Sequence, residues 1–106
     1  MTASALGKKL RELRKAKGLT LEELAQQTES SKSYIWELEN KPVAKPSGEK
    51  LAKLAAVFDV TPEFLLDETR TEVTVDDRDN AFFRKYQAAN PAVKDKINRI
   101  LDVLDE

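Results

Sequence analysis

Apolar side chains recur three or four residues apart through the first part of the chain, which is the spacing of an amphipathic helix. In segment 4–17 this spacing is kept by Leu6, Leu10, Leu13 and Ala16. Gly18 follows, and glycine commonly ends a helix because it adopts the left-handed backbone conformation at low cost. The pattern therefore predicts a first helix over residues 4–17.

Two short helices are predicted next, joined by a turn of about three residues. Thr20 and Glu23 match a capping box, in which each side chain bonds the other residue's backbone amide. We expect the helix that starts there to end near residue 28. Ser31 is a suitable cap for the following helix, in which Ile35 and Leu38 face inward. The two helices together are typical of a helix-turn-helix, whose second helix is held out from the body.

Prolines mark the end of this unit. Pro42 and Pro46 predict a loop over residues 40–46, because proline interrupts both helix and sheet. Ser47 is expected to cap a fourth helix, and Thr61 with Pro62 to start a short fifth helix. The apolar residues of these two helices are Leu51, Leu54, Ala55, Phe58, Phe64, Leu65 and Leu66.

The rest of the chain predicts a linker and a helical hairpin. Segment 67–79 is dominated by Asp and Glu, so we expect it to be extended or flexible. Asn90 and Pro91 then match the cap and first residue of a last helix. An apolar stripe follows the hairpin: Phe82, Phe83, Tyr86, Val93, Ile97, Ile100, Leu101 and Leu104. The chain is therefore predicted to be all-α, with a five-helix domain over 1–67, a linker over 68–79 and a C-terminal helical segment over 80–106.

Composition removes most catalytic chemistry. The 106 residues include neither Cys nor His, which excludes disulfides, Cys/His zinc sites, catalytic triads and histidine acid–base chemistry. We therefore expect no enzyme, no metal and no cofactor. No run of 18 apolar residues is present and the first residues resemble no signal peptide, so we expect no membrane span and a cytoplasmic location.

Charge is unevenly distributed along the chain. Residues 1–58 carry 11 Lys or Arg and 7 Asp or Glu, a net charge of +4, whereas residues 59–106 carry 7 and 12, a net charge of −5. A positive N-terminal part favours contact with phosphates, and an acidic C-terminal part repels them. Ordinary solvated surfaces would give the same balance.

The stretch from Leu19 reads LTLEELAQQTESSKSYIWELE and continues through a proline-bearing loop to EKLAKLAAVFDVTPEFLL. Over residues 6–67 the chain resembles the lambda-repressor-like, or XRE-type, helix-turn-helix family of transcription regulators. The resemblance implies that the helix opened by Ser31 enters the DNA major groove while the preceding helix crosses the phosphate backbone.

The resemblance places base-reading candidates on the exposed face of that helix: Ser31, Lys32, Ser33, Trp36 and Glu37. Lys32 suits guanine or a phosphate, Glu37 suits the cytosine amino group, and Ser33 pairs with several base edges. Lys32 as a plain surface charge is the alternative. Trp36 suits either a thymine methyl group or packing against the linker or a partner subunit.

The resemblance also implies supporting contacts. The phosphate candidates are Thr20, Tyr34, Asn40, Lys41, Lys45, Ser47 and Gly48. Arg14 and Glu39 match a structural ion pair that orients the reading helix. The chain departs from the family at Leu21, where a DNA-contacting Gln is common, and at Glu29, where Gly usually accommodates a positive φ.

These features predict a transcription regulator, a repressor that binds a palindromic operator on double-stranded DNA as a homodimer through helix 31–39. The C-terminal apolar stripe is expected to pair with its twin, the alternative being that it folds back on the N-terminal domain. A second hypothesis is an antitoxin or adaptor whose acidic C-terminal segment binds a toxin or other protein partner, with DNA binding secondary.

Overall fold

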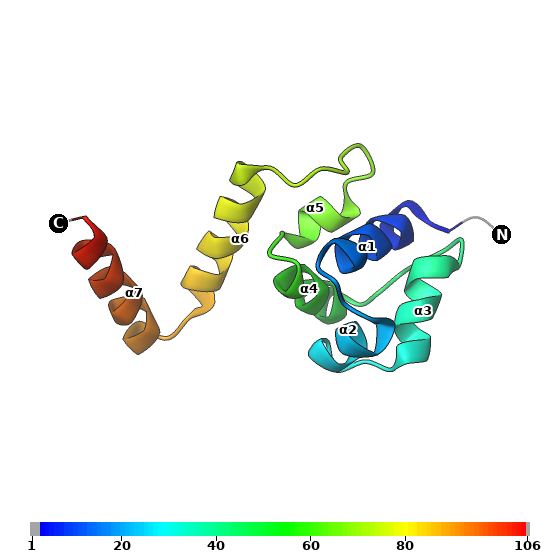
Figure 1. The fold of residues 1–106 in the computed structure, drawn as a ribbon, viewed down its shortest axis with the longest axis horizontal. Helices are drawn as coiled ribbons and strands as arrows, with labels where there is room; N and C mark the ends of the chain where they lie inside the picture. Colours follow the sequence, from blue (N-terminus) through cyan, green and yellow to red (C-terminus); the bar gives the residue numbers. More distant parts are fainter. Residues whose placement is uncertain (1–2, 106) are drawn as a thin grey trace.

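The computed structural model describes residues 3–105. Residues 1, 2 and 106, which belong to the predicted N-terminal domain and C-terminal segment, lie outside the described range. Within this range the chain is all-helical and contains no strand. The helices are α1 (Ala5–Ala16), α2 (Leu21–Gln27), α3 (Lys32–Asn40), α4 (Gly48–Val57), α5 (Pro62–Leu66), α6 (Val75–Ala88) and α7 (Pro91–Leu104). Helices α1 to α5 form one compact body, and α6 and α7 extend from it (Figure 1), giving a molecule of 55 × 28 × 24 Å. The predicted all-α fold class is confirmed.

Side-chain caps begin the helices where the sequence predicts them. Each capping oxygen accepts a hydrogen bond from the amide three residues ahead, which satisfies a donor that the helix itself leaves free. The predicted caps found in the structure are Thr20, Ser31, Ser47, Thr61 and Asn90, and Ser4 caps α1 in the same way. Gly18 follows the first helix with φ of +73°, the conformation expected of a glycine stop.

The start of α6 corrects the sequence interpretation. The segment 68–79 was expected to be extended or flexible, and this is wrong from Val75 onward, because α6 begins there. The Thr74 amide donates to the Asp77 carboxylate at 2.7 Å, and the Asp77 amide donates to the Thr74 hydroxyl at 3.2 Å. This is a capping box with Asp in the place of the usual Glu or Gln, so the common sequence signature is missing.

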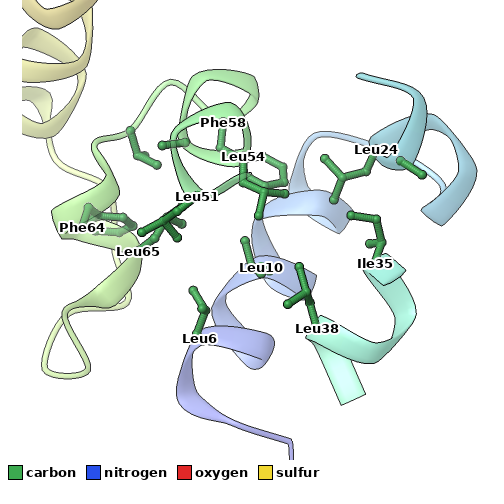
Figure 2. Close-up of a cluster of buried hydrophobic side chains, with 13 residues drawn as sticks. Leu6, Leu10, Leu24, Ile35, Leu38, Leu51, Leu54, Phe58, Phe64 and Leu65 are labelled. Atoms are coloured by element: carbon green, nitrogen blue, oxygen red, sulfur yellow. The ribbon is translucent and has the colours of Figure 1, made fainter. Parts of the chain in front are cut away.

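One hydrophobic core holds α1 to α5 together (Figure 2). Its most buried large side chains are Leu10, Leu24, Ile35, Leu54 and Leu65. Ala16 and Leu66 lie on predicted apolar helices but are exposed. Leu21 stands where the resemblance implies a DNA-contacting Gln. Its side chain packs against the core, so it does not take over that contact.

Helices α1 and α3 approach very closely at Gly7. A Cβ atom built on Gly7 would lie 2.5 Å from the backbone oxygen of Leu38 and 2.9 Å from that of Glu39. A residue with a side chain fits there only if the two helices move apart. The contact fixes how deeply the end of α3 rests on α1.

The C-terminal pair of helices forms the predicted hairpin. The Asn98 side chain on α7 donates to the Tyr86 hydroxyl on α6 at 3.3 Å, and the Lys94 ammonium lies 5.5 Å from the Tyr86 ring centroid. No residue of α7 is buried. The hairpin therefore leaves most of its apolar surface open.

Candidate nucleic-acid interface

The turn between α2 and α3 determines where α3 points. Glu29 adopts a φ of +54°, a conformation that favours glycine, and the Ser30 amide donates to the Ala25 oxygen at 2.8 Å. The Lys50 ammonium of α4 donates to the backbone oxygens of Thr28 and Glu29 at 2.8 and 3.0 Å. The turn therefore has the backbone geometry that favours glycine, and a lysine from another helix holds it.

Helix α3 is anchored on one side and open on the other. Ile35 is 1% exposed and Leu38 6% exposed, so both fasten the helix to the core. The opposite edge carries the five base-reading candidates, and all of them are exposed: Ser31, Lys32, Ser33, Trp36 and Glu37. Figure 1 shows α3 at the side of the molecule away from α6 and α7. This edge is open to solvent.

The open edge forms a shallow hollow lined by Lys32, Ser33, Trp36 and Glu37. The Trp36 side chain is half exposed, so this chain does not bury it against its own linker. A half-exposed indole beside a cation and a carboxylate offers one apolar and two charged contacts within a single helix face. That mixture suits base edges, which combine methyl groups with hydrogen-bonding atoms.

The two charges of the hollow are paired in the free protein. The Lys32 ammonium lies 3.1 Å from a Glu22 carboxylate oxygen on α2, and Glu37 pairs with Lys41 at 3.4 Å. All four side chains are at least half exposed. Ion pairs between exposed groups are weak in water, so a charged ligand could displace them at low cost.

Arg14 and Glu39 form the ion pair implied by the family resemblance. Arg14 donates from Nε to Glu39 Oε2 at 2.7 Å and from Nη2 to Oε1 at 3.0 Å, and a third bond reaches the Leu19 oxygen at 2.9 Å. The hydrogen bond to Glu39 raises the pKa of Arg14 above its ordinary value, so the pair stays charged. The pair joins α1 to the end of α3 and fixes the angle of the open edge.

Two of the phosphate candidates cap the helices that precede and follow α3 in the sequence. Thr20 and Ser47 are exposed caps, and their hydroxyls accept from the amides of Glu23 and Lys50 at 3.0 and 3.1 Å. Lys45 and Gly48 are exposed beside Ser47 in the loop and first turn of α4. A phosphate here would meet the positive end of the α4 dipole together with the Lys45 ammonium.

The other candidates belong to α3 and its C-terminal end. Lys41 is exposed, and the Asn40 side-chain amide donates to the Trp36 oxygen at 2.8 Å. Tyr34 is half-buried, which raises the pKa of its hydroxyl, and its ring centroid lies 5.8 Å from the Lys50 ammonium. Tyr34 and Lys50 therefore face each other where α3 meets α4.

Sequence reasoning missed three residues that shape this interface. Lys50 holds the turn, Glu22 holds Lys32, and Gly7 allows α3 to approach α1. The sequence gives a weak indication for Glu22, because Glu22 and Lys32 carry opposite charges in the first turns of the two helices of a helix-turn-helix. Nothing local distinguishes Lys50 from other surface lysines.

Comparison with known proteins identifies the family. The helix-turn-helix family model matches residues 10–65, which is more than half of the chain. The chain belongs to the helix-turn-helix family. The resemblance to lambda-repressor-like regulators inferred from residues 6–67 is thereby confirmed.

Several helix-turn-helix relatives are similar over the same region. The HTH-type transcriptional regulator SinR of Bacillus subtilis is 40% identical over 63 residues, which are 59% of this chain and 57% of that protein. The chain therefore spans little more than half the length of this relative. The crystal structure of SinR in complex with DNA matches 58% of this chain and 98% of the solved chain, with 39% identity and a TM-score of 0.55.

A second solved structure of this helix-turn-helix family matches nearly the whole chain. The complex of the SinR protein with the SinI protein covers 94% of both chains, with 27% identity and a TM-score of 0.58. The likeness therefore includes the region of α6 and α7.

Within residues 3–105 no helix is both long and apolar enough to cross a bilayer, and no three potential ligand side chains are grouped around a possible metal position.

Proposed function

We propose that this protein is a sequence-specific DNA-binding transcription regulator, a repressor that binds a palindromic operator as a homodimer through α3. The observation that carries the proposal is the open edge of α3, fastened beneath by Ile35 and Leu38 and held at its end by the Arg14–Glu39 pair. The DNA complex solved for SinR supports it by similarity. The protein acts by binding and not by catalysis.

Each exposed side chain of α3 has a proposed role in the major groove. Lys32 donates to guanine O6 and N7, and Glu37 accepts from the cytosine amino group. Trp36 packs on a thymine methyl group, while Ser31 and Ser33 bond base edges with little discrimination. Glu37 repels phosphates, so it contributes selectivity more than affinity.

The phosphate candidates supply position and salt-dependent affinity. Lys41 and Lys45 contribute charge on either side of the loop, and both are exposed. The remaining members of the proposed set act as hydrogen-bond donors: Thr20, Tyr34, Asn40, Ser47 and Gly48. A hydroxyl that accepts from a capped amide still has its own proton to donate, so Thr20 and Ser47 serve both roles.

We propose that the C-terminal hairpin supplies the dimer contact. Its apolar stripe is open in the single chain, with exposed side chains at Phe82, Phe83, Val93, Ile100, Leu101 and Leu104 and partly buried ones at Tyr86 and Ile97. Exposed apolar side chains gathered on one element often mark an interaction surface. Pairing with a second copy covers it and brings two α3 helices to two half-sites.

The dimer is tested by measuring the molecular mass of the full chain in solution. Ile100→Asp places a charge in the stripe and is expected to give a monomer, whereas Asp102→Ala on the opposite face of α7 leaves the dimer unchanged. Truncation after Asp67 is likewise expected to give a monomer. A dimer that survives both changes contradicts the assignment of the contact.

The function is tested by selecting bound duplexes from a random DNA pool and measuring affinity against salt. We expect a palindromic consensus, bound with a steep salt dependence, as phosphate contacts require. Selection of no consensus at low salt would contradict sequence-specific binding. Such a regulator acts in the compartment that holds the DNA, which we propose is the cytoplasm.

A second function is favoured by the same open stripe. The SinR–SinI complex matches the chain through α6 and α7, so this hairpin is also a candidate surface for a different protein partner. An antitoxin or adaptor would use the acidic C-terminal part in this way, with DNA binding secondary. Purifying the chain from its native cells shows whether a second protein accompanies it in a fixed ratio.

A further inference from the structure

The segment between the DNA-binding helices and α6 is tied to the body along its length. The Lys9 ammonium of α1 donates to the backbone oxygen of Phe64 at 2.6 Å and also to that of Asp67. Arg70 pairs with Asp77, which is buried at the start of α6, and Val73 packs against the core. This segment is therefore not a free tether.

Helix α6 itself is fastened to α4 and α5 by three cations. Arg78 donates to the backbone oxygens of Phe58 and Asp59, the latter at 2.9 Å, just beyond the end of α4. Lys85 pairs with the Asp59 carboxylate. Arg84 pairs with Glu63 of α5 at 2.7 Å. Cations suit this place because the carbonyl groups at a helix C-terminus carry partial negative charge.

A small apolar hollow lies between these cations. Ala81 is 4% exposed, and it faces a surface that includes Ala55 and Val60. The three cations hold α6 beside α4 and α5 (Figure 1), and Ala81 is buried between them.

We propose that Arg78, Arg84 and Lys85 are positioning residues that restrict the dimer to operators with one half-site spacing. The inference rests on the proposed function. Figure 1 places α7 at the opposite end of the molecule from α3, so a dimer joined through the hairpin sets the distance between two α3 helices through α6. A half-site moves by about 3.4 Å along the duplex and rotates with each added base pair. A fixed α6 cannot follow that displacement, whereas a flexible connection can.

The test compares spacing preference in the full-length protein. The variants are Arg78→Ala and the double change Arg84→Ala/Lys85→Ala, whose side chains are half exposed in the wild type. Arg99→Ala, which breaks an exposed pair with Asp95 within α7, is the control. The probes are duplexes carrying the selected half-sites with the selected spacing, with one to four extra base pairs, and a single half-site.

We expect wild type and control to lose about tenfold or more in affinity when two base pairs are added, and both α6 variants to lose about threefold or less. Affinity for the single half-site stays the same in all four proteins, which a general loss of structure would not allow. The inference is overturned if the wild type binds every spacing equally well, or if both α6 variants keep the wild-type preference for one spacing. Either result leaves the proposed function intact. Failure of the wild type to prefer any duplex over random DNA overturns both.

Discussion

Arg14 on α1 holds the Glu39 carboxylate with two hydrogen bonds, of 2.7 and 3.0 Å, and Glu39 is only 2% exposed. A buried carboxylate is stable as an anion only while its cation remains in place. The same residues connect the first helix to the last turn of α3. Support of the fold and orientation of the open edge therefore depend on one contact.

Glu39→Ala is expected to destabilise the protein by about 3–5 kcal/mol, because it leaves the Arg14 guanidinium without its partner in a largely buried position. Glu37→Ala is the matched control, since Glu37 belongs to the same helix but pairs with Lys41 in solvent. Urea unfolding followed by circular dichroism measures both. Equal midpoints for the two variants would contradict the role assigned to the pair.

Gly7→Ala is expected to cost about 1–3 kcal/mol, because its Cβ would meet backbone oxygens of α3 and push α1 away. Gly48→Ala serves as the control, since a Cβ at Gly48 meets nothing within 4 Å. Thermal unfolding distinguishes them. A Gly7 variant as stable as the Gly48 variant would show that α1 and α3 can separate freely.

The positive φ of Glu29 predicts a stabilising change. Glu29→Gly removes the strain of a left-handed residue, about 1–2 kcal/mol. The extra freedom of glycine in the unfolded chain offsets part of this gain, so stability is expected to rise by up to about 1 kcal/mol. Gly18→Ala introduces the same strain where φ is +73° and no neighbour is within 4 Å, so it should lower stability by a similar amount. Shifts of the same sign in the two thermal midpoints would contradict this explanation.

The α6 cap predicts a dependence on acid. Burial raises the pKa of Asp77, but hydrogen bonds from Thr74 and Arg70 more than compensate, and the net shift is downward. A carboxyl group with a lowered pKa in the folded state adds stability above its ordinary pKa, and that stability is lost as pH falls through the folded value. Asp77→Asn should therefore show a weaker loss of stability than wild type as pH is lowered below about 4. Identical pH profiles would contradict the cap.

The helix ends of α1 to α5 were predictable because each depends on a local signal, such as Ser31 before α3 or Thr61 before Pro62. The start of α6 was not, since Asp77 replaces the usual longer side chain of a capping box. Contacts between distant segments were also invisible in the sequence. Lys50 and Arg78 bond backbone oxygens about 20 residues away, and any exposed lysine or arginine could do so. Exposure of the α3 edge followed from the spacing of Ile35 and Leu38, but the pairing of its charges did not.

Base reading by α3 is tested by the ratio of affinities for the selected operator and for random duplex in three variants: Lys32→Ala, Glu37→Ala and Lys41→Ala. We expect Lys32→Ala and Glu37→Ala to reduce the free-energy preference for operator over random DNA by about 1–3 kcal/mol each, because each loses a contact to one base pair. Lys41→Ala should weaken binding to both duplexes alike and reduce the salt slope by about one. Equal effects of all three changes on operator and random DNA would contradict the claim that α3 reads the bases.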